Sequence, residues 1–427
     1  MRERETSSSS MSDSCNSRHF SWLMKSCFPN PQHHHPQPIS TAFSNHHQTT
    51  TTISSLPDDL ILECLSRVSP SSLPSLSLVC RRWSHLILSS AFSDLRRLHG
   101  RLRLSIFALS FSESSLFAAT LPSVLDASWK LTSFLASDAV LPESFHASFS
   151  HARVLAIGRE IYILGRNATV RFDTWTGKAA SRSPMLFPRK KFAAAVVSGR
   201  IYIAGGTART AAVEEYDPDT EEWHVVADAP RRRYGCIGAS VDGVFYVIGG
   251  LRIGTSGNEA SRAAGTEAHV YASSMDLYDV EARGWLRSRA VPGGGCVVAA
   301  CAAGGHVYVL ASHAVELSFW RFDARRKSNS SGGGGGFGEW CRMKSPPLPA
   351  QVRLDSTVRF SCVGVGDKVV LIQVMGCIDD LLRRSGRSIR GLREGLVLFY
   401  DGAAGDWSRG ADLPEVIRRA ACVCVEC

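Results

Sequence analysis

The chain has 427 residues, of which 44% are hydrophobic and 20% are charged. Its formal net charge is +9, from 48 Lys and Arg against 39 Asp and Glu. This balance excludes disorder along the whole length and allows a large core, and the mild basicity permits an acidic partner without requiring nucleic acid.

The 13 cysteines are odd in number and irregularly spaced. This is typical of reduced, mostly buried thiols in an intracellular protein, so we expect the cytoplasm, the nucleus or both. The longest apolar stretch, from Cys296 to Ser312, is interrupted by Gly304 and Gly305. It is too short to span a bilayer, and no membrane partner is expected.

Residues 1–53 are rich in Ser, Thr, Gln, His and Pro. Such a composition predicts a disordered low-complexity tail. The histidines at 33–35 and 46–47 make a metal site conceivable, but this tract offers no packing to fix ligand geometry.

The composition changes at Ser54, and residues 54–100 predict a small helical unit. Ser55 can cap a helix, Pro57 suits its first turn, and Asp58 and Asp59 favour its positive end. Apolar residues then recur near helical spacing in two segments separated by Ser69-Pro70. They are Leu60, Ile61, Leu65 and Val68 in the first segment, and Leu76, Val79, Cys80 and Trp83 in the second.

The block LPDDL at 56–60, followed by LSLVCRRW at 76–83, resembles an F-box. The resemblance implies docking on a Skp-type adaptor and, through it, on a cullin. An ordinary helical hairpin is the alternative. The positions that the resemblance assigns to adaptor contact and to the later apolar pattern are Leu56, Pro57, Leu60, Ile61, Leu65, Val79, Cys80 and Trp83.

After about residue 104 the sequence becomes rich in Val, Ile, Tyr and Gly and repeats itself. The segment IYILG at 161–165 recurs as IYIAGG at 201–206, FYVIGG at 245–250 and VYVL at 307–310, with a degenerate copy at 369–372. An aromatic-Asp pair and then a Trp follow most copies, as in Asp217 and Trp223. A fixed period of this kind is typical of a repeat architecture.

This pattern resembles the kelch repeat, which implies a β-propeller with one four-stranded blade per repeat and with the Tyr and Trp side chains packed between blades. We therefore expect an α+β multidomain chain, a small all-α F-box followed by an all-β propeller over 104–427. Five repeats are visible, at about 151–189, 190–230, 234–291, 296–347 and 356–414. Residues 104–142 and 418–427 predict a sixth blade that is closed by the C-terminal strand. The first repeat departs from the pattern, because its Trp175 falls early.

Basic clusters occupy loops that should share one rim of the ring, since alternate loops of antiparallel strands lie at the same end. They predict a surface that binds acidic or phosphorylated groups of a substrate. A solvated surface that only keeps the ring soluble is the alternative. The candidate substrate-binding residues are Arg189, Arg232, Arg233, Arg383, Arg384 and Arg387.

No catalytic, cofactor or metal site is predicted. The histidines of the repeat region show no ligand spacing. The sequence C-x-C-x-x-C at 422–427 suggests a buried strand rather than zinc, because Cys422 and Cys424 would face the same side. No motif for nucleic-acid binding is present.

The resemblances together imply a non-enzymatic substrate receptor of a Skp–cullin–F-box ubiquitin ligase, with the propeller binding an unidentified target protein. Two alternatives remain open. One is an F-box scaffold outside a ligase, and the other is a propeller that binds a metabolite or carbohydrate.

Overall fold

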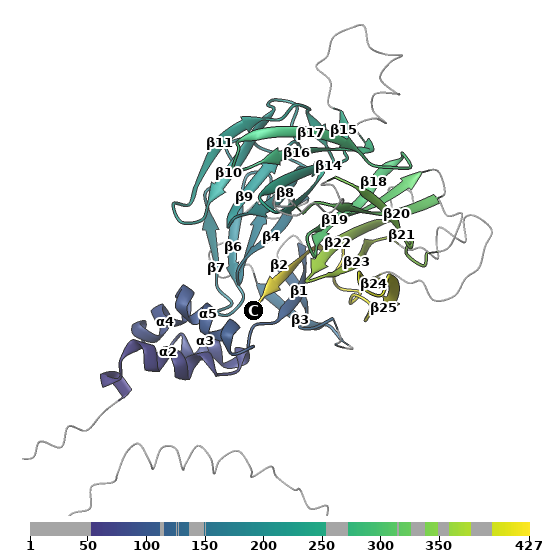
Figure 1. The fold of residues 1–427 in the computed structure, drawn as a ribbon. Helices are drawn as coiled ribbons and strands as arrows, with labels where there is room; N and C mark the ends of the chain where they lie inside the picture. The colour runs from purple at the N-terminus through teal and green to yellow at the C-terminus, as the bar shows by residue number, and fades with distance from the viewer. Residues whose placement is uncertain are drawn as a thin grey trace, which may run out of the picture. The chain divides into compact units, whose positions relative to one another are not determined.

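The computed structural model describes residues 53–111, 115–124, 126, 128–135, 149, 151–252, 272–313, 316–325, 338–348, 358–376 and 395–427. The predicted tail, residues 1–53, lies almost wholly outside them. The chain divides into two compact units, Met1–Leu56 and Pro57–Cys427. The second unit contains four α-helices and the described strands (Figure 1).

The helices are short and lie close together in the sequence. They are α2 (Asp58–Ser66), α3 (Leu73–Leu76), α4 (Arg81–Leu88) and α5 (Ser90–Leu98), with single 3-10 turns η1 (Ile53–Ser55) and η2 (Pro70–Ser72). The described residues contain no helix that is long and apolar enough to cross a membrane.

Local chemistry explains where the helices begin. Pro57 is the N-cap of α2, so the helix starts two residues later than a cap at Ser55 would give, and the two acidic residues of its first turn face the positive end of the helix dipole. Ser89 Oγ accepts a hydrogen bond from the Phe92 N–H and caps α5. The apolar interior of this helical unit is made by Ile61, Leu65, Leu73, Ile87 and Phe92.

Arg96 of α5 is fully buried and joins two helices. Its Nη1 donates to the carbonyl oxygens of Ser66 at 3.2 Å and Val68 at 2.8 Å, at the C-terminal end of α2. These oxygens have no partner within the helix, and a cation is favourable at this end of the dipole. Arg96 therefore fixes α2 against α5.

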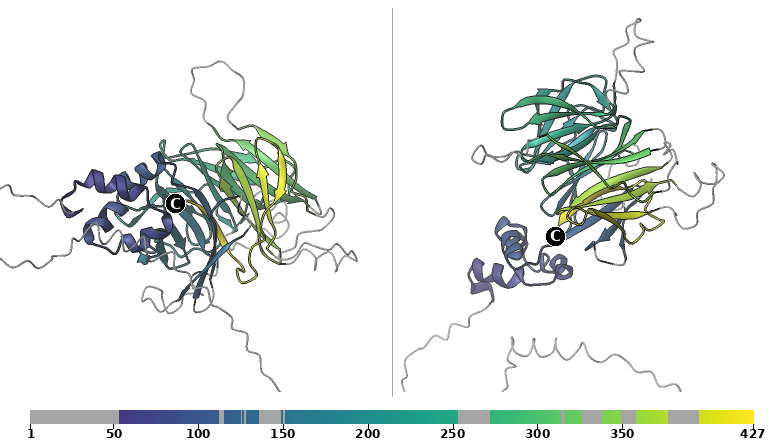
Figure 2. Two further views of the ribbon diagram at one scale, coloured as in Figure 1. Left: turned by 90° about the horizontal axis from the view of Figure 1, so that it is seen from below. Right: turned by 45° about the vertical axis from the view of Figure 1, so that its right-hand side comes forward.

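The rest of the second unit is a propeller of six four-stranded antiparallel sheets among the described strands (Figures 1 and 2). The first three blades, written from the innermost strand outward, are β26 (Ala421–Glu426), β1 (Leu104–Phe111), β2 (Ser115–Leu121), β3 (Lys130–Leu135); β4 (Arg153–Ile157), β5 (Glu160–Leu164), β6 (Thr169–Asp173), β7 (Ala179–Arg182); and β8 (Ala193–Val197), β9 (Arg200–Ala204), β10 (Ala212–Asp217), β11 (Glu222–Asp228).

The next three are β13 (Ile237–Val241), β14 (Val244–Ile248), β16 (Ser274–Asp279), β17 (Gly284–Ala290); β18 (Cys296–Ala303), β19 (His306–His313), β20 (Glu316–Asp323), β21 (Trp340–Met343); and β22 (Arg359–Val365), β23 (Lys368–Met375), β24 (Val397–Asp401), β25 (Asp406–Arg409). A small two-stranded ladder joins β12 (Arg233–Tyr234) to β15 (Leu251–Arg252).

The C-terminal strand closes the ring. β26 pairs with β1 from Leu104↔Glu426 to Leu109↔Ala421 and becomes the innermost strand of the first blade. The innermost strands contact one another in the closed order β26, β4, β8, β13, β18, β22. The prediction of six blades with a shared first blade is therefore confirmed, and this closure leaves no inner edge unpaired.

The repeated Trp and Gly residues hold neighbouring blades together. Trp223, Trp285 and Trp407 donate their indole N–H to the carbonyl oxygens of Ser183, Asp228 and Lys344, each in the preceding blade, at 2.7–2.9 Å. Gly205 has φ +74°, and a Cβ there would lie 2.7 Å from the Arg233 oxygen of the next blade. The motif therefore encodes contact between blades as well as strand endings.

Trp175 behaves differently, and its early position in the repeat has a physical reason. It lies in the turn between β6 and β7, is 3% exposed, and meets Phe92 of α5 edge-on at 5.4 Å. The Arg159 guanidinium lies 4.7 Å from its ring. This residue attaches the helical unit to the second blade instead of joining two blades.

Candidate functional site

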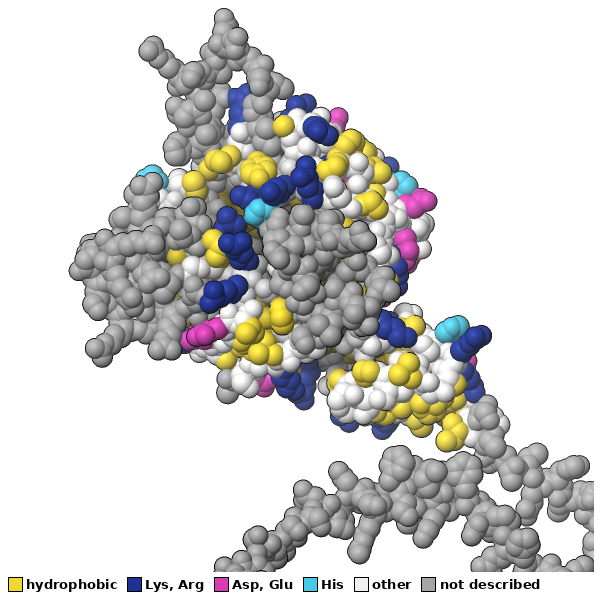
Figure 3. Space-filling model, turned by 180° about the vertical axis from the view of Figure 1, so that it is seen from behind, with side chains coloured by type: hydrophobic (Ala, Val, Ile, Leu, Met, Phe, Trp, Pro, Cys, Tyr) yellow, Lys and Arg dark blue, Asp and Glu magenta, His cyan; other side chains and the backbone are white. Residues whose placement is uncertain are grey.

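The helical unit exposes large apolar side chains at the start of α2 and before α4. Leu60, Leu78 and Val79 are 50%, 73% and 60% exposed, and Figure 3 shows hydrophobic side chains gathered on this unit. Arg82 Nε donates to Asp58 Oδ1 at 2.7 Å and ties the start of α4 to the start of α2. Exposed apolar groups of this size mark an interaction surface. The sequence did not single out Leu78.

The eight residues predicted to contact an adaptor divide between this surface and the interior. Pro57 and Cys80 are exposed, as are Leu60 and Val79, while Leu56 and Trp83 are half-buried. Cys80 is also the N-cap of α4, because its Sγ accepts the Trp83 N–H.

Ile61 and Leu65 do not fit the predicted role. They are 3% and 4% exposed and lie one helical turn apart on the face of α2 that packs against α5. Their side chains build the interior of the helical unit and present no surface to a partner.

The arginines predicted to bind substrate are placed mainly inside the propeller. Arg189 is 1% exposed, and it donates to Glu214 Oε1 at 2.6 Å, the Gly205 oxygen at 2.7 Å and the Ala212 oxygen at 2.6 Å. Arg233 is fully buried. It repeats the arrangement one blade later, with Asp276 Oδ2 at 2.8 Å and the Gly249 oxygen at 2.8 Å.

Both arginines are structural, and the prediction that they bind substrate is wrong. A buried carboxylate on the third strand of the blade holds each guanidinium in the interior. Arg232 is half-exposed, with Nη1 3.3 Å from the Ala208 oxygen. Arg383, Arg384 and Arg387 lie outside the described residues.

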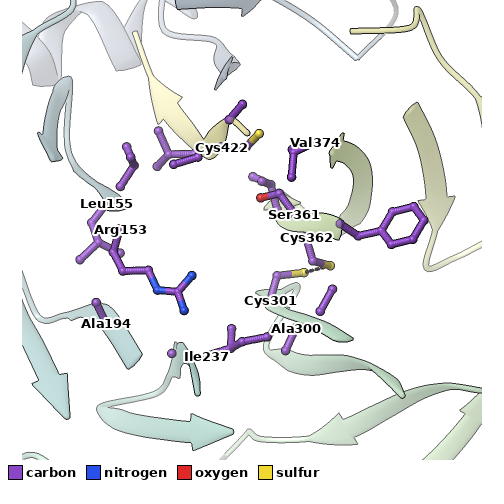
Figure 4. Close-up of a pocket in the computed structure, with 18 of the residues that line it drawn as sticks. Arg153, Leu155, Ala194, Ile237, Ala300, Cys301, Ser361, Cys362, Val374 and Cys422 are labelled. Atoms are coloured by element: carbon purple, nitrogen blue, oxygen red, sulfur yellow. Dashed lines mark hydrogen bonds between the residues drawn. The ribbon is translucent and has the colours of Figure 1, made fainter. Parts of the chain in front are cut away.

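A cavity of about 880 Å³ runs along the axis of the ring and is lined by the innermost strands of all six blades. Figure 4 looks into it and shows the Arg153 side chain pointing inward. Five basic residues of the lining lie at the start of an innermost strand. Each is either the first residue of the strand or two residues before it: His151, Arg153, Lys191, Arg359 and Arg419. The innermost strands all run in the same direction, so these residues gather at one end, here called the basic mouth.

The basic mouth is electrostatically uncompensated among the described residues. The described lining of the cavity contains no Asp or Glu. Burial, together with the positive charges of Lys190, Lys191, Arg359 and Arg153, lowers the pKa of His151 to about 4. Burial and the nearby Arg359, Lys190 and Arg153 also lower the pKa of Lys191. A group of like charges that disfavour one another in this way favours an anion.

The cavity also contains thiols. Cys362 and Cys301, on adjacent innermost strands, have their sulfur atoms 3.1 Å apart (Figure 4). Burial raises the pKa of both Cys422 and Cys424 to about 12, so these β26 thiols keep their protons. In the part of the chain that the structure describes, no three His, Cys, Asp or Glu side chains come together as metal ligands.

Comparisons with known proteins find matches in both the helical unit and the propeller. The model of the F-box domain matches residues 53–94, and the model of the kelch motif matches residues 188–230. An F-box/kelch-repeat protein of Arabidopsis thaliana is 63% identical over 427 residues, which cover 97% of this chain and 100% of that protein.

More distant proteins match in part. A second Arabidopsis thaliana F-box/kelch-repeat protein is 26% identical over 253 residues, covering 56% of this chain and 61% of its own length. A solved structure titled "Structure of YjhT" is 16% identical with a TM-score of 0.44, and the match covers 64% of this chain and 86% of that one.

Proposed function

The chain belongs to the F-box/kelch-repeat family, and we propose that it is the substrate-recognition subunit of a Skp–cullin–F-box ubiquitin ligase. The F-box docks on a Skp-type adaptor and through it on a cullin, and the kelch propeller binds a target protein for ubiquitination and degradation. Proteins of this family are generally adaptors without catalysis of their own, so the chemistry belongs to the partner subunits.

One observation carries the proposal: the apolar surface of the F-box is exposed although the unit has a closed interior. Ile61, Leu65, Leu73 and Phe92 are buried within the second unit, whereas Leu60, Leu78 and Val79 stay accessible to solvent. A protein core would normally bury these three side chains, and a helical partner with an apolar groove would cover them.

A receptor also has to hold its target at a fixed place relative to the ligase, and the attachment of the helices to the propeller serves this role. Phe92 and Trp175 meet ring to ring at 5.4 Å. Arg97 of α5 donates to both carboxylate oxygens of Glu426 in β26, at 3.3 and 2.9 Å. Orientation of this kind raises the effective concentration of a bound target at the transfer site.

The test is co-purification of the full chain with a Skp-type adaptor. The variant Leu60→Glu with Val79→Glu places two charges on the exposed apolar surface and should abolish adaptor binding. The matched control is Leu131→Glu with Val225→Glu, which makes the same chemical change at propeller positions that are 54% and 50% exposed. The control should bind as the wild type does.

The outcome also separates the alternatives. If the folded wild-type chain binds no adaptor, the proposal fails. If it binds the adaptor but never recruits a cullin, the chain acts as a scaffold outside a ligase. A metabolite- or carbohydrate-binding propeller would instead show a small ligand that co-purifies with the chain whether or not the F-box surface is changed.

A further inference from the structure

The basic mouth differs from the other charged clusters of the propeller. Three buried or half-buried arginines elsewhere in the propeller are matched by carboxylates: Arg189 with Glu214, Arg233 with Asp276, and Arg159 with Asp173 at 3.1 Å. Within the described residues, Lys191, Arg359 and Arg419 have no carboxylate within ion-pair distance. Positive charges left unmatched beside one another lower stability unless a ligand compensates them.

Ring closure brings these charges together from distant parts of the sequence. His151 and Arg153 come from the second blade, Lys191 from the third, Arg359 from the sixth and Arg419 from the first. All five residues line the same cavity, and the charges of Lys191, Arg359 and Arg153 lower the pKa of His151. The mouth therefore exists only in the closed ring.

Arg153 is held in a fixed position within the mouth. Its Nε donates to the Phe192 oxygen at 2.8 Å, just before the third blade, and its Nη2 to the Cys236 oxygen at 2.9 Å, just before the fourth. Nη1 has no described partner, and Figure 4 shows the guanidinium directed into the cavity. A donor positioned in advance loses little conformational freedom when it binds an anion.

The basic surface continues outward from the mouth. Next to Lys191, a second hollow of about 270 Å³ lies between the second and third blades and is lined by Arg166, Lys190, Arg209 and Tyr234. Figure 3 shows Lys and Arg side chains gathered in a band on one face of the propeller beside a His. An elongated basic path with an aromatic ring suits an extended chain better than a single small ion.

Apolar side chains border the same mouth. Phe111 and Phe149 stack with ring centroids 5.7 Å apart and line the cavity together with Phe360. Cations beside apolar walls match a peptide in which a charged group is flanked by apolar residues.

We propose that the basic mouth binds a phosphorylated segment of the target protein, with the phosphate between Lys191, Arg359 and the guanidinium of Arg153 and the adjoining peptide along the second hollow. The inference rests on the proposed role of the propeller as the substrate-binding part. A phosphoserine or phosphothreonine brings close to two negative charges and three acceptor oxygens, which fits several converging donors. A single carboxylate satisfies fewer of them and binds more weakly.

The test uses the full chain in complex with a Skp-type adaptor and three immobilised peptide libraries. Each library has a fixed central residue, phosphoserine, glutamate or serine, and degenerate flanking residues. The complex should be retained on the phosphoserine library, less on the glutamate library and least on the serine library. Inorganic phosphate should compete at high concentration.

The decisive variant is Lys191→Gln with Arg359→Gln, because neither side chain forms an ion pair within the described residues; Lys191 contacts only the face of the Tyr234 ring, 5.5 Å from its centroid. Loss of two charge-assisted contacts should weaken binding of a selected phosphopeptide at least about 150-fold, the low end of the range for two hydrogen bonds to charged groups. The matched control is Lys178→Gln with Arg283→Gln, two exposed basic residues in the turns between third and fourth strands, at the other end of the ring. It should bind as the wild type does.

The result would overturn the inference if the complex retains the serine and phosphoserine libraries equally, or if the Lys191/Arg359 variant binds the phosphopeptide as well as the control. Tight binding of inositol hexakisphosphate without retention on any library would also overturn it, in favour of a small polyanion. Adaptor binding is measured on the same samples, so failure of the mouth and failure of the ligase proposal are distinguishable.

Discussion

The buried pair Arg189–Glu214 gives the sharpest test of the distinction between structural and ligand-binding arginines. We expect Arg189→Met to destabilise the propeller and not to act through the loss of a substrate contact. The side chains of both residues are 0% exposed, and Arg189 serves three acceptors at 2.6–2.7 Å. Methionine fills a similar volume but donates no hydrogen bond.

The magnitude follows from what the substitution leaves behind. Glu214 retains one donor, the Leu186 N–H at 2.7 Å, and two carbonyl oxygens lose theirs. Breaking a buried ion pair by removing one partner costs about 3–5 kcal/mol, because the remaining charge stays buried without compensation. We therefore expect the free energy of unfolding to fall by about 4 kcal/mol.

The assay is denaturant-induced unfolding followed by tryptophan fluorescence. The matched control is Arg232→Met, which removes a half-exposed arginine with one long contact and should cost less than about 0.5 kcal/mol. The double variant Arg189→Met with Glu214→Gln removes the buried charge and keeps an acceptor for Leu186. It should therefore be more stable than the single variant by about 1–2 kcal/mol.

The reasoning would be refuted if Arg189→Met lowered the free energy of unfolding by less than about 1 kcal/mol. It would be refuted equally if the Glu214→Gln change destabilised the Arg189→Met variant as much as it destabilises the wild type. Additive effects of this kind would show that the two side chains act independently.

Three further predictions address the attachment of the helices, acid stability and thiol reactivity. Trp175→Ala should cost about 3–5 kcal/mol and speed hydrogen exchange in α5, since it removes a buried ring that packs on Phe92; unchanged exchange in α5 would contradict this. The hydrogen bond from Lys368, with the Ala404 and Ala403 N–H groups, lowers the pKa of Asp401 to about 2. The folded pKa lies below the unfolded one, so the stability that ionised Asp401 contributes is complete above about pH 4 and is lost as the pH falls toward 2. Between these pH values, the free energy of unfolding of Asp401→Asn should therefore fall less than that of the wild type in an acid titration. Alkylation at pH 7.5, followed by peptide mass spectrometry, should modify the exposed Cys341 well before Cys422, because the Cys422 pKa of about 12 leaves almost no thiolate. Equal rates of modification would contradict the burial of the Cys422 thiol.

The blade count could be predicted because the residues that define each blade lie close together in the sequence. The glycines must accept positive φ beside a neighbouring backbone, and Trp223 must reach a carbonyl of the preceding blade. These demands recur in every regular blade, so the same residue types recur in the sequence. The closing strand followed from the count, since an incomplete first blade requires a partner for β1.

The arginines were misjudged because burial depends on residues far away in the chain. Arg189 and Arg233 lie in loops beside other basic residues, which favoured a surface position. Their partners Glu214 and Asp276 lie 25 and 43 residues further on. A signal was nevertheless present: each acid stands two residues before the buried Tyr of an otherwise buried strand, as in Glu214 and Tyr216. A carboxylate on an inward-facing position requires a cation, and the preceding loop supplies it.

The basic mouth could not be found from spacing at all. His151, Lys191, Arg359 and Arg419 are separated in the sequence by dozens to more than a hundred residues. Each looks like an ordinary loop residue until the ring closes. Only the common direction of the innermost strands places their starting residues at one end.

The closing strand β26 connects the two proposed roles of the protein. Arg419, just before its first residue, belongs to the basic mouth, while Glu426 near its other end holds Arg97 of α5. Trp175, which also meets the helical unit, lies in a turn at that same far end. The mouth and the helical attachment are therefore separated by the length of a strand, about 17–20 Å for five to six residues. A target held at the mouth would leave the F-box surface free for the adaptor, so the two binding events need not compete.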